Sequence, residues 1–214
     1  MHKITTIILL CCAFLMSSTD ISAQNSDIRL LKSINSNPSG VLRNYSRFIT
    51  NTTTGFVLAT PVTMGAVALI DKNDQLLKDA IYVGAAIGID GILTYSAKKA
   101  FHRQRPYLAY PNDIVAYDTE SSMSFPSGHT SLAFTTVTAL SLRYPKWYVI
   151  APGYFWACSV GYSRMNLGVH YPSDVLAAAV LGAGSAFVTY KINEWFWKNQ
   201  ENKKRISLQN FDPF

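Results

Sequence analysis

Apolar residues gather in five segments that are separated by polar stretches. The segments are rich in Ala, Gly, Val and Leu, as packed or membrane helices are, and they cover residues 56–70, 80–97, 130–142, 147–162 and 175–192. None shows the strict alternation of apolar and polar residues that predicts a half-buried strand. A looser helical stripe precedes them and is interrupted at 37–40; it consists of Ile28, Leu30, Leu31, Ile34 and Leu42. The pattern predicts an all-α bundle of about six helices.

The length of the apolar segments leaves two interpretations open. A membrane-spanning helix needs about 20 apolar residues, and these segments hold 13–18. Helices buried in the core of a soluble protein therefore remain an alternative. Asp90 lies inside the second segment, where an acid is tolerated if it faces the bundle interior, so we expect it to accept an internal hydrogen bond.

The charges between the segments favour the membrane interpretation. If the chain starts outside, five crossings place residues 71–79, 143–146 and the C-terminal tail on the inner side. Arg143 and Lys146 lie in the second of these loops, and the tail is basic, as the positive-inside rule expects. The aromatic run 195–197 then lies where an interfacial belt belongs. We predict about five transmembrane helices.

The N-terminus has the features of an export signal. A basic start precedes thirteen apolar residues (4–16), and small residues precede Gln24, so we expect cleavage after Ala23. An uncleaved membrane helix is the alternative. The predicted organisation is a signal peptide (1–23), an N-terminal periplasmic or interfacial segment (24–53), a helical domain (54–197) and a basic tail (198–214). Within the second part, we interpret Asn44-Tyr45-Ser46 and Asn51-Thr52-Thr53 as loop or cap residues.

Composition narrows the function classes. Charged residues make up 15% of the chain against a usual share of about 25%, and apolar residues make up 49%, which excludes a disordered chain. The formal net charge of +6 suits anionic lipids or phosphate-bearing substrates. Nucleic acid is the least favoured partner, because no basic run longer than 203–205 occurs. Two of the three cysteines lie in the signal, so we expect no disulfide and no thiolate metal site in a processed chain, and a buried Cys158.

Three polar segments on the predicted outer side carry candidate chemistry. Pro126-Ser127-Gly128 is a tight turn that opens a helix at His129. A helix start presents free backbone N–H groups and binds anions, and Ser127 adds a hydroxyl donor. Lys98, Arg105 and Arg164 adjoin the ends of apolar helices, so one end of the bundle can gather them around a phosphate.

A histidine and a carboxylate complete the set. His170 and Asp174 are four residues apart, and Pro172 between them is tolerated in the first turn of a helix. The carboxylate can then accept from one imidazole nitrogen and leave the other with a free lone pair, while His129 can donate a proton. These groups suffice for phosphoryl transfer to a histidine with no metal and no cofactor. We expect Lys99, His102 and Arg103 nearby to face solvent or lipid headgroups.

The three segments resemble the signature of the superfamily of type 2 phosphatidic acid phosphatases and vanadium-dependent haloperoxidases. The signature reads Lys-x6-Arg-Pro, then Pro-Ser-Gly-His, then Ser-Arg-x5-His-x3-Asp. All specified positions match in order, from Lys98 through Pro106, from Pro126 through His129, and from Ser163 through Asp174. The resemblance spans residues 98–174, and the flanking helices suit the helical bundle of that family.

The resemblance implies a role for each motif residue. Lys98, Arg105, Arg164, Ser127 and the Gly128 backbone would bind phosphate oxygens. His170 would attack phosphorus and become a phosphohistidine, Asp174 would orient it, and His129 would protonate the leaving oxygen and then activate water. The residues between the first two motifs, 107–124, would select the headgroup.

The resemblance also implies a class of substrate. It points to a phosphatase at the outer face of a bacterial inner membrane acting on undecaprenyl pyrophosphate, phosphatidylglycerol phosphate, phosphatidic acid or a lipid A phosphate. Three alternatives stay open: a soluble periplasmic acid phosphatase, a vanadium haloperoxidase, and a non-catalytic membrane protein that binds anions or lipids. Nothing in the sequence indicates the oligomeric state.

Overall fold

The computed structural model describes residues 21–36 and 39–209 of the chain. These residues form six long helices and one short helix: α2 (Ile21–Asn35), α3 (Gly40–Ile70), α4 (Asp74–Phe101), α5 (Pro106–Ala109), α6 (Gly128–Arg143), α7 (Trp147–Asn166) and α8 (Pro172–Gln209). None of the described residues belongs to a strand, so the predicted all-α fold is confirmed. Most of the predicted signal segment lies outside the described residues, and its cleavage stays a prediction.

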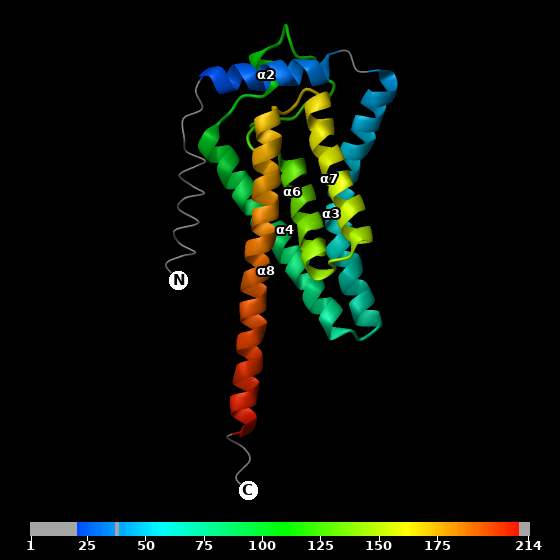
Figure 1. Ribbon diagram of the computed structural model, residues 1–214, viewed down its shortest axis with the longest axis vertical. Helices are drawn as coiled ribbons and strands as arrows, with labels where there is room; N and C mark the ends of the chain where they lie inside the picture. The colour runs from blue at the N-terminus through cyan, green and yellow to red at the C-terminus, as the bar shows by residue number, and fades with distance from the viewer. Residues whose placement is uncertain (1–20, 37–38, 210–214) are drawn as a thin grey trace.

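Five helices make a bundle and a sixth lies across its end. Each predicted apolar segment falls within one of α3, α4, α6, α7 and α8. The central helix is α6, which packs against the four others. Figure 1 shows α2 crossing the end of the bundle where α6 and α8 begin and α7 ends, while α8 extends far beyond the opposite end. The loops at the α2 end hold the three motif segments.

Local sequence signals set the helix ends at the site. At the end of α4, His102 adopts a left-handed conformation (φ 45°) and its N–H donates to the carbonyl of Lys98. This reverses the chain and sends residues 103–105 back over the bundle end. Pro172 begins α8, as predicted, because its fixed φ suits a first helical position and it has no N–H to satisfy.

The contact between α6 and α8 depends on small and polar residues. A Cβ atom on Gly182 would lie 2.2 Å from the carbonyl oxygen of Ser131, so only glycine permits this approach. Asp90 of α4 is fully buried against the same contact and accepts hydrogen bonds from Ser131 and Ser185. The predicted internal hydrogen bond of Asp90 is thus confirmed.

Two sequence interpretations are wrong. Asn44-Tyr45-Ser46 and Asn51-Thr52-Thr53 are not loop or cap residues, because α3 runs without a break from Gly40 to Ile70. Ser46 and Thr53 face inward and are buried, whereas Asn44 and Asn51 are exposed on the outer side of the helix. Cys158 is exposed rather than buried, because its position on α7 turns away from the core.

Large apolar side chains cover the outside of the bundle. They are exposed on α3, α4, α7 and α8, for example Phe56, Leu58, Val62, Ile81, Ile92, Phe155, Leu176, Val180 and Phe187. Among the residues that the structure describes, two helices are long and apolar enough to cross a membrane, Gly40–Ile70 and Pro172–Gln200, and only 17% and 33% of their most apolar stretches are buried. The count of five spans stays a prediction.

Candidate active site

The motif residues meet at one end of the bundle. Lys98 lies in the last turn of α4, Arg105 precedes α5, and Arg164 lies in the last turn of α7. Ser127 is the N-cap residue of α6, although its side chain makes no capping hydrogen bond, and Gly128 and His129 begin the first turn. His170 lies in the loop before α8 and Asp174 in the first turn of that helix. Residues that are distant in the sequence are therefore neighbours, as the spacing predicts.

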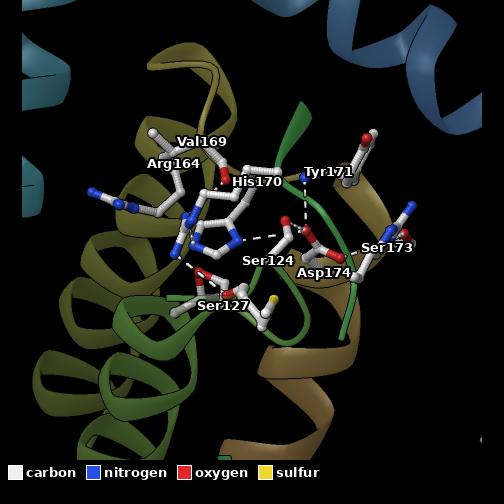
Figure 2. A network of polar contacts seen from close by, with 12 residues as sticks. Ser124, Ser127, Arg164, Val169, His170, Tyr171, Ser173 and Asp174 are labelled. Carbon is white, nitrogen blue, oxygen red and sulfur yellow. Dashed lines mark hydrogen bonds and ion pairs between the residues drawn. The ribbon is translucent and has the colours of Figure 1, made fainter. Parts of the chain in front are cut away.

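His170 is held with one nitrogen toward a carboxylate and the other toward a cation. Its side chain is fully buried, and Nδ1 lies 3.5 Å from Oδ2 of Asp174, toward which the ring points in Figure 2. Nε2 lies 3.1 Å from an N–H of Arg105. Because a guanidinium only donates, Nε2 is the acceptor and Nδ1 carries the proton. Burial lowers the pKa of His170 to about 4 against the opposing effect of Asp174. The ring is neutral, with its lone pair on the nitrogen that faces the cations.

Asp174 is anchored on all sides. One carboxylate oxygen accepts from the hydroxyl of Ser124 at 2.5 Å and from the backbone N–H of Tyr171 at 3.0 Å. The other accepts from Arg103 at 2.6 Å. These contacts, some of which Figure 2 shows, fix the carboxylate that lies beside Nδ1 of His170.

The prediction of a solvent-facing Arg103 is therefore wrong. Its guanidinium joins Asp174 to Asp27 of α2, 2.7 Å away, and lies over the ring of Tyr171 at 3.9 Å from the ring centroid. Lys99 and His102 are exposed, as expected. Sequence reasoning missed Arg103 and Ser124. No signal in the sequence indicates Arg103, because the left-handed conformation of His102 that turns the chain back toward the site is visible only in the structure.

Arg105 and Arg164 are the two most deeply buried cations of the site, each with 1% of its side chain exposed. Arg105 donates to the carbonyls of Ser122 and Val169 at 2.8 and 2.9 Å. Arg164 donates to Thr50 at 3.0 Å. Among the described residues its Nε has no partner although the atom is buried. Both guanidiniums also contact the carboxylate of Glu120, which lies in the stretch 107–124 but was not singled out from the sequence.

The start of α6 contributes a histidine beside this pair. The His129 side chain is 33% exposed, and its Nδ1 lies 3.6 Å from Oε1 of Glu120. Burial and the charge of Arg164 lower the pKa of His129 to about 4. Ser127 is fully buried, and its hydroxyl lies 2.9 Å from that of Thr130. A helix start leaves its first N–H groups without partners inside the helix, which suits the anion-binding turn expected here.

Lys98 completes the positive end of the bundle. Its ammonium donates to the carbonyl of Met123. Burial, and repulsion from Arg105, lower its pKa to about 8, so it is charged at neutral pH. Among the described residues, no group of three or more His, Cys, Asp or Glu side chains is placed to hold a metal ion.

Helix α2 forms the outer wall of the site. Asp27 accepts from the backbone N–H of Ser173 at 2.9 Å as well as from Arg103. Asn35, at the other end of α2, donates to the carbonyls of Val115 and Asn166, both at 3.0 Å. Helix α2 is therefore tied to the loops that carry the site.

The comparison with known families agrees with this geometry. The family model described as the PAP2 superfamily matches residues 79–198, which include all the motif positions. The chain belongs to the PAP2 superfamily. An undecaprenyl-diphosphatase of Sulfolobus acidocaldarius is 30% identical to this PAP2 chain over 166 residues, 78% of each chain.

Solved structures of PAP2 proteins have the same fold. A transmembrane PAP2-type phosphatidylglycerolphosphate phosphatase from Bacillus subtilis aligns with a TM-score of 0.70 and 26% identity, over 91% of this chain and 97% of that one. A bacterial vanadium-dependent chloroperoxidase aligns with a TM-score of 0.58 and 14% identity, over 82% of this chain and 50% of that one, which shows a shared fold alone.

Proposed function

We propose that this chain is a membrane phosphatase that hydrolyses a lipid phosphate or pyrophosphate through a phosphohistidine at His170. One observation carries the proposal. A buried, neutral His170 directs the lone pair of Nε2 toward the buried guanidinium of Arg105, while a fixed carboxylate lies behind Nδ1. A structural histidine needs no such arrangement, whereas in-line attack on a bound phosphoryl group does.

The chemistry follows from these positions. Arg105, Arg164 and Lys98 bind the non-bridging oxygens of the phosphoryl group. The N–H of Arg105 that contacts Nε2 then donates to a phosphate oxygen instead, which frees the lone pair of Nε2. Nε2 then forms a bond to phosphorus as the bond to the lipid oxygen breaks. His129 donates a proton to that leaving oxygen.

The second half returns the enzyme to its starting state. His129 removes a proton from water, whose oxygen attacks phosphorus as the P–N bond breaks. Orthophosphate leaves, and His170 is neutral again. Asp174 stabilises the proton on Nδ1 throughout, which offsets the positive charge that forms on the ring during attack.

The outer surface supports a lipid substrate. Soluble monomers rarely expose large contiguous apolar patches, and here exposed apolar side chains extend over α3, α4, α7 and α8. A bilayer around these helices places the motif end near a headgroup layer, where the acyl or isoprenoid chain of a substrate can stay in lipid. With the basic loop 143–146 inside, the site faces the periplasm of a bacterial inner membrane.

The test is phosphate release by separated membrane and soluble fractions. Each is assayed on undecaprenyl pyrophosphate and on a water-soluble phosphomonoester, with EDTA present. We expect release by membranes, preference for the lipid, and no release by His170→Asn. His102→Asn is the matched control, because asparagine also tolerates the left-handed conformation at 102.

Other outcomes would contradict the proposal in defined ways. Release by the soluble fraction on the small ester would make the chain a soluble acid phosphatase. Full activity of His170→Asn would rule out the phosphohistidine. Loss of activity in EDTA, restored by a metal, would contradict the metal-free reaction.

A further inference from the structure

The carboxylate of Glu120 lies where the proposed phosphate would bind. Oε2 accepts from NH2 of Arg105 at 2.5 Å, and Oε1 accepts from NH2 of Arg164. Oε1 also lies 3.6 Å from His129. All three partners are residues that the proposed function assigns to the phosphoryl group. Carboxylates and phosphates compete for the same guanidinium N–H groups.

The two guanidiniums need an anion between them. Each is 99% buried, and two like charges that share a site repel one another in a poorly solvated environment. Burial opposes ionisation of Glu120, but the charges of Arg164 and Arg105 outweigh it and hold the pKa of this carboxyl below its usual range. Glu120 is thus an anion at neutral pH and offsets one of the two positive charges, while the carboxylate of Asp118 lies 3.4 Å from Arg164.

Hydrogen bonds hold the backbone at and after Glu120, whereas its side chain is partly exposed to solvent. The hydroxyl of Tyr107 donates to the Glu120 carbonyl at 3.1 Å, and Arg105 holds the following turn through the carbonyl of Ser122. The Glu120 side chain is 23% exposed, unlike the buried arginines. Rotation about its side-chain bonds moves the carboxylate to solvent without opening the loop, whereas Arg105 stays fixed by its other hydrogen bonds.

We propose that Glu120 is an internal competitor of the phosphate group. It occupies the anion site of the ligand-free enzyme, keeps Arg105 and Arg164 in position, and must leave before substrate binds. It returns as orthophosphate leaves and so limits product inhibition. The anion competition rests on the geometry alone, and only its consequence for turnover rests on the proposed function.

The test is equilibrium binding of orthophosphate to the purified full chain in detergent, by calorimetry. Glu120→Gln keeps the shape of the side chain and removes its charge, so we expect orthophosphate to bind at least about tenfold more tightly than to wild type. Asp113→Asn is the matched control. Asp113 lies in the same loop and pairs with exposed Lys32 at 2.8 Å, so its change should leave the affinity unaltered.

Turnover gives a second readout. Glu120→Gln should lower KM for the lipid substrate and strengthen inhibition by orthophosphate. Equal or weaker orthophosphate binding by a folded Glu120→Gln protein would overturn the inference even if wild type hydrolyses lipid phosphates. Tighter binding by that variant would uphold the inference even if wild type shows no turnover, which would count against the proposed function alone.

The wild-type chain offers a test that needs no variant. In a structure with orthovanadate bound, we expect Arg105 and Arg164 to contact the oxyanion and the Glu120 carboxylate to lie outside the site. A bound oxyanion with Glu120 still paired to both guanidiniums would overturn the inference.

Discussion

At the scale of single residues, the site is a buried histidine whose orientation depends on a chain of contacts. His170 is positioned by Asp174, Asp174 by Ser124 and Arg103, and Arg103 by Asp27. The motif spacing predicts the first link only. The remaining links join residues that are 50 to 76 positions apart, and no periodicity in the sequence connects them.

Replacing Arg103 tests whether these contacts behind His170 matter for catalysis. Arg103→Gln removes the charged partner of one Asp174 oxygen, so the carboxylate holds His170 less firmly. We expect kcat on a lipid phosphate to fall about tenfold or more, with little change in KM, and Arg103→Lys to restore part of the loss. Lys99→Gln, an exposed neighbour of equal charge, should have no effect. A raised KM at unchanged kcat would instead assign Arg103 to substrate binding.

Phosphate binding should also change the protonation of His129. In the ligand-free state, burial and Arg164 lower the pKa of this histidine to about 4. A phosphate dianion brings more negative charge to the same place than the single carboxylate of Glu120, and negative charge favours the protonated ring. The pKa of His129 should therefore rise when orthophosphate saturates the site, which prepares it to donate a proton.

Histidine-selective NMR titration measures this change. The chain has four histidines, and a His129→Gln variant identifies the signal. The signal of His102, outside the site, should not respond to orthophosphate. A pKa for His129 that stays near 4 or falls on saturation would contradict its role as the proton donor.

At the scale of the helices, apolar periodicity predicts those parts of the bundle that face apolar neighbours. It fails for the first half of α3, because the inward face there is polar. The hydroxyl of Thr50 accepts a hydrogen bond from Arg164, and the hydroxyl of Thr52 accepts one from the indole N–H of Trp156 at 3.0 Å. A helix that borders a polar site has the composition of a loop, so sequence reasoning misassigned it.

The contact between α6 and α8 gives a matched pair of glycines on one helix. A Cβ on Gly182 would meet the Ser131 carbonyl at 2.2 Å, whereas a Cβ on exposed Gly184 meets nothing within 4 Å. Gly182→Ala should push the helices apart, lower the free energy of unfolding by about 1–3 kcal/mol and reduce activity, since α6 and α8 carry His129 and Asp174. Gly184→Ala should leave both unchanged or raise stability. Thermal melting in detergent checks this, and equal melting temperatures would contradict the close packing.

At the scale of the whole molecule, polarity is arranged along the bundle. Helix α2 crosses one end of the bundle (Figure 1). Cations and hydrogen-bonded acids gather at that end, and exposed apolar side chains cover the rest of the bundle. In the proposed function the positive charge at the site end binds phosphate, which would explain why that end departs from a simple positive-inside count. The opposite turn, 144–146, joins α6 to α7 and lies at the predicted inner surface.

Cys158 tests this arrangement. It is exposed on α7, yet a bilayer around the bundle would shield it from water, where the reactive thiolate forms. In a Cys11→Ser/Cys12→Ser background Cys158 is the remaining thiol. We expect a charged maleimide to label it only after denaturation, because the reagent does not enter lipid. Rapid labelling in native membranes, or recovery of a labelled soluble protein, would contradict the predicted spans.

Two added cysteines then give the orientation of the molecule. The two variants are Asn112→Cys and Lys146→Cys. Asn112 lies in the exposed loop at the site end, and Lys146 lies in the opposite turn, where its side chain makes no capping hydrogen bond. In intact spheroplasts, with Cys158→Ala added to the same background, the charged maleimide should label the first variant and reach the second only after permeabilisation. The reverse order would place the active site in the cytoplasm, and labelling of both would mean that the bundle does not separate the two sides. Sidedness decides which pool of lipid phosphate the enzyme meets, because a charged headgroup crosses a bilayer slowly and the site can act only on headgroups at its own surface.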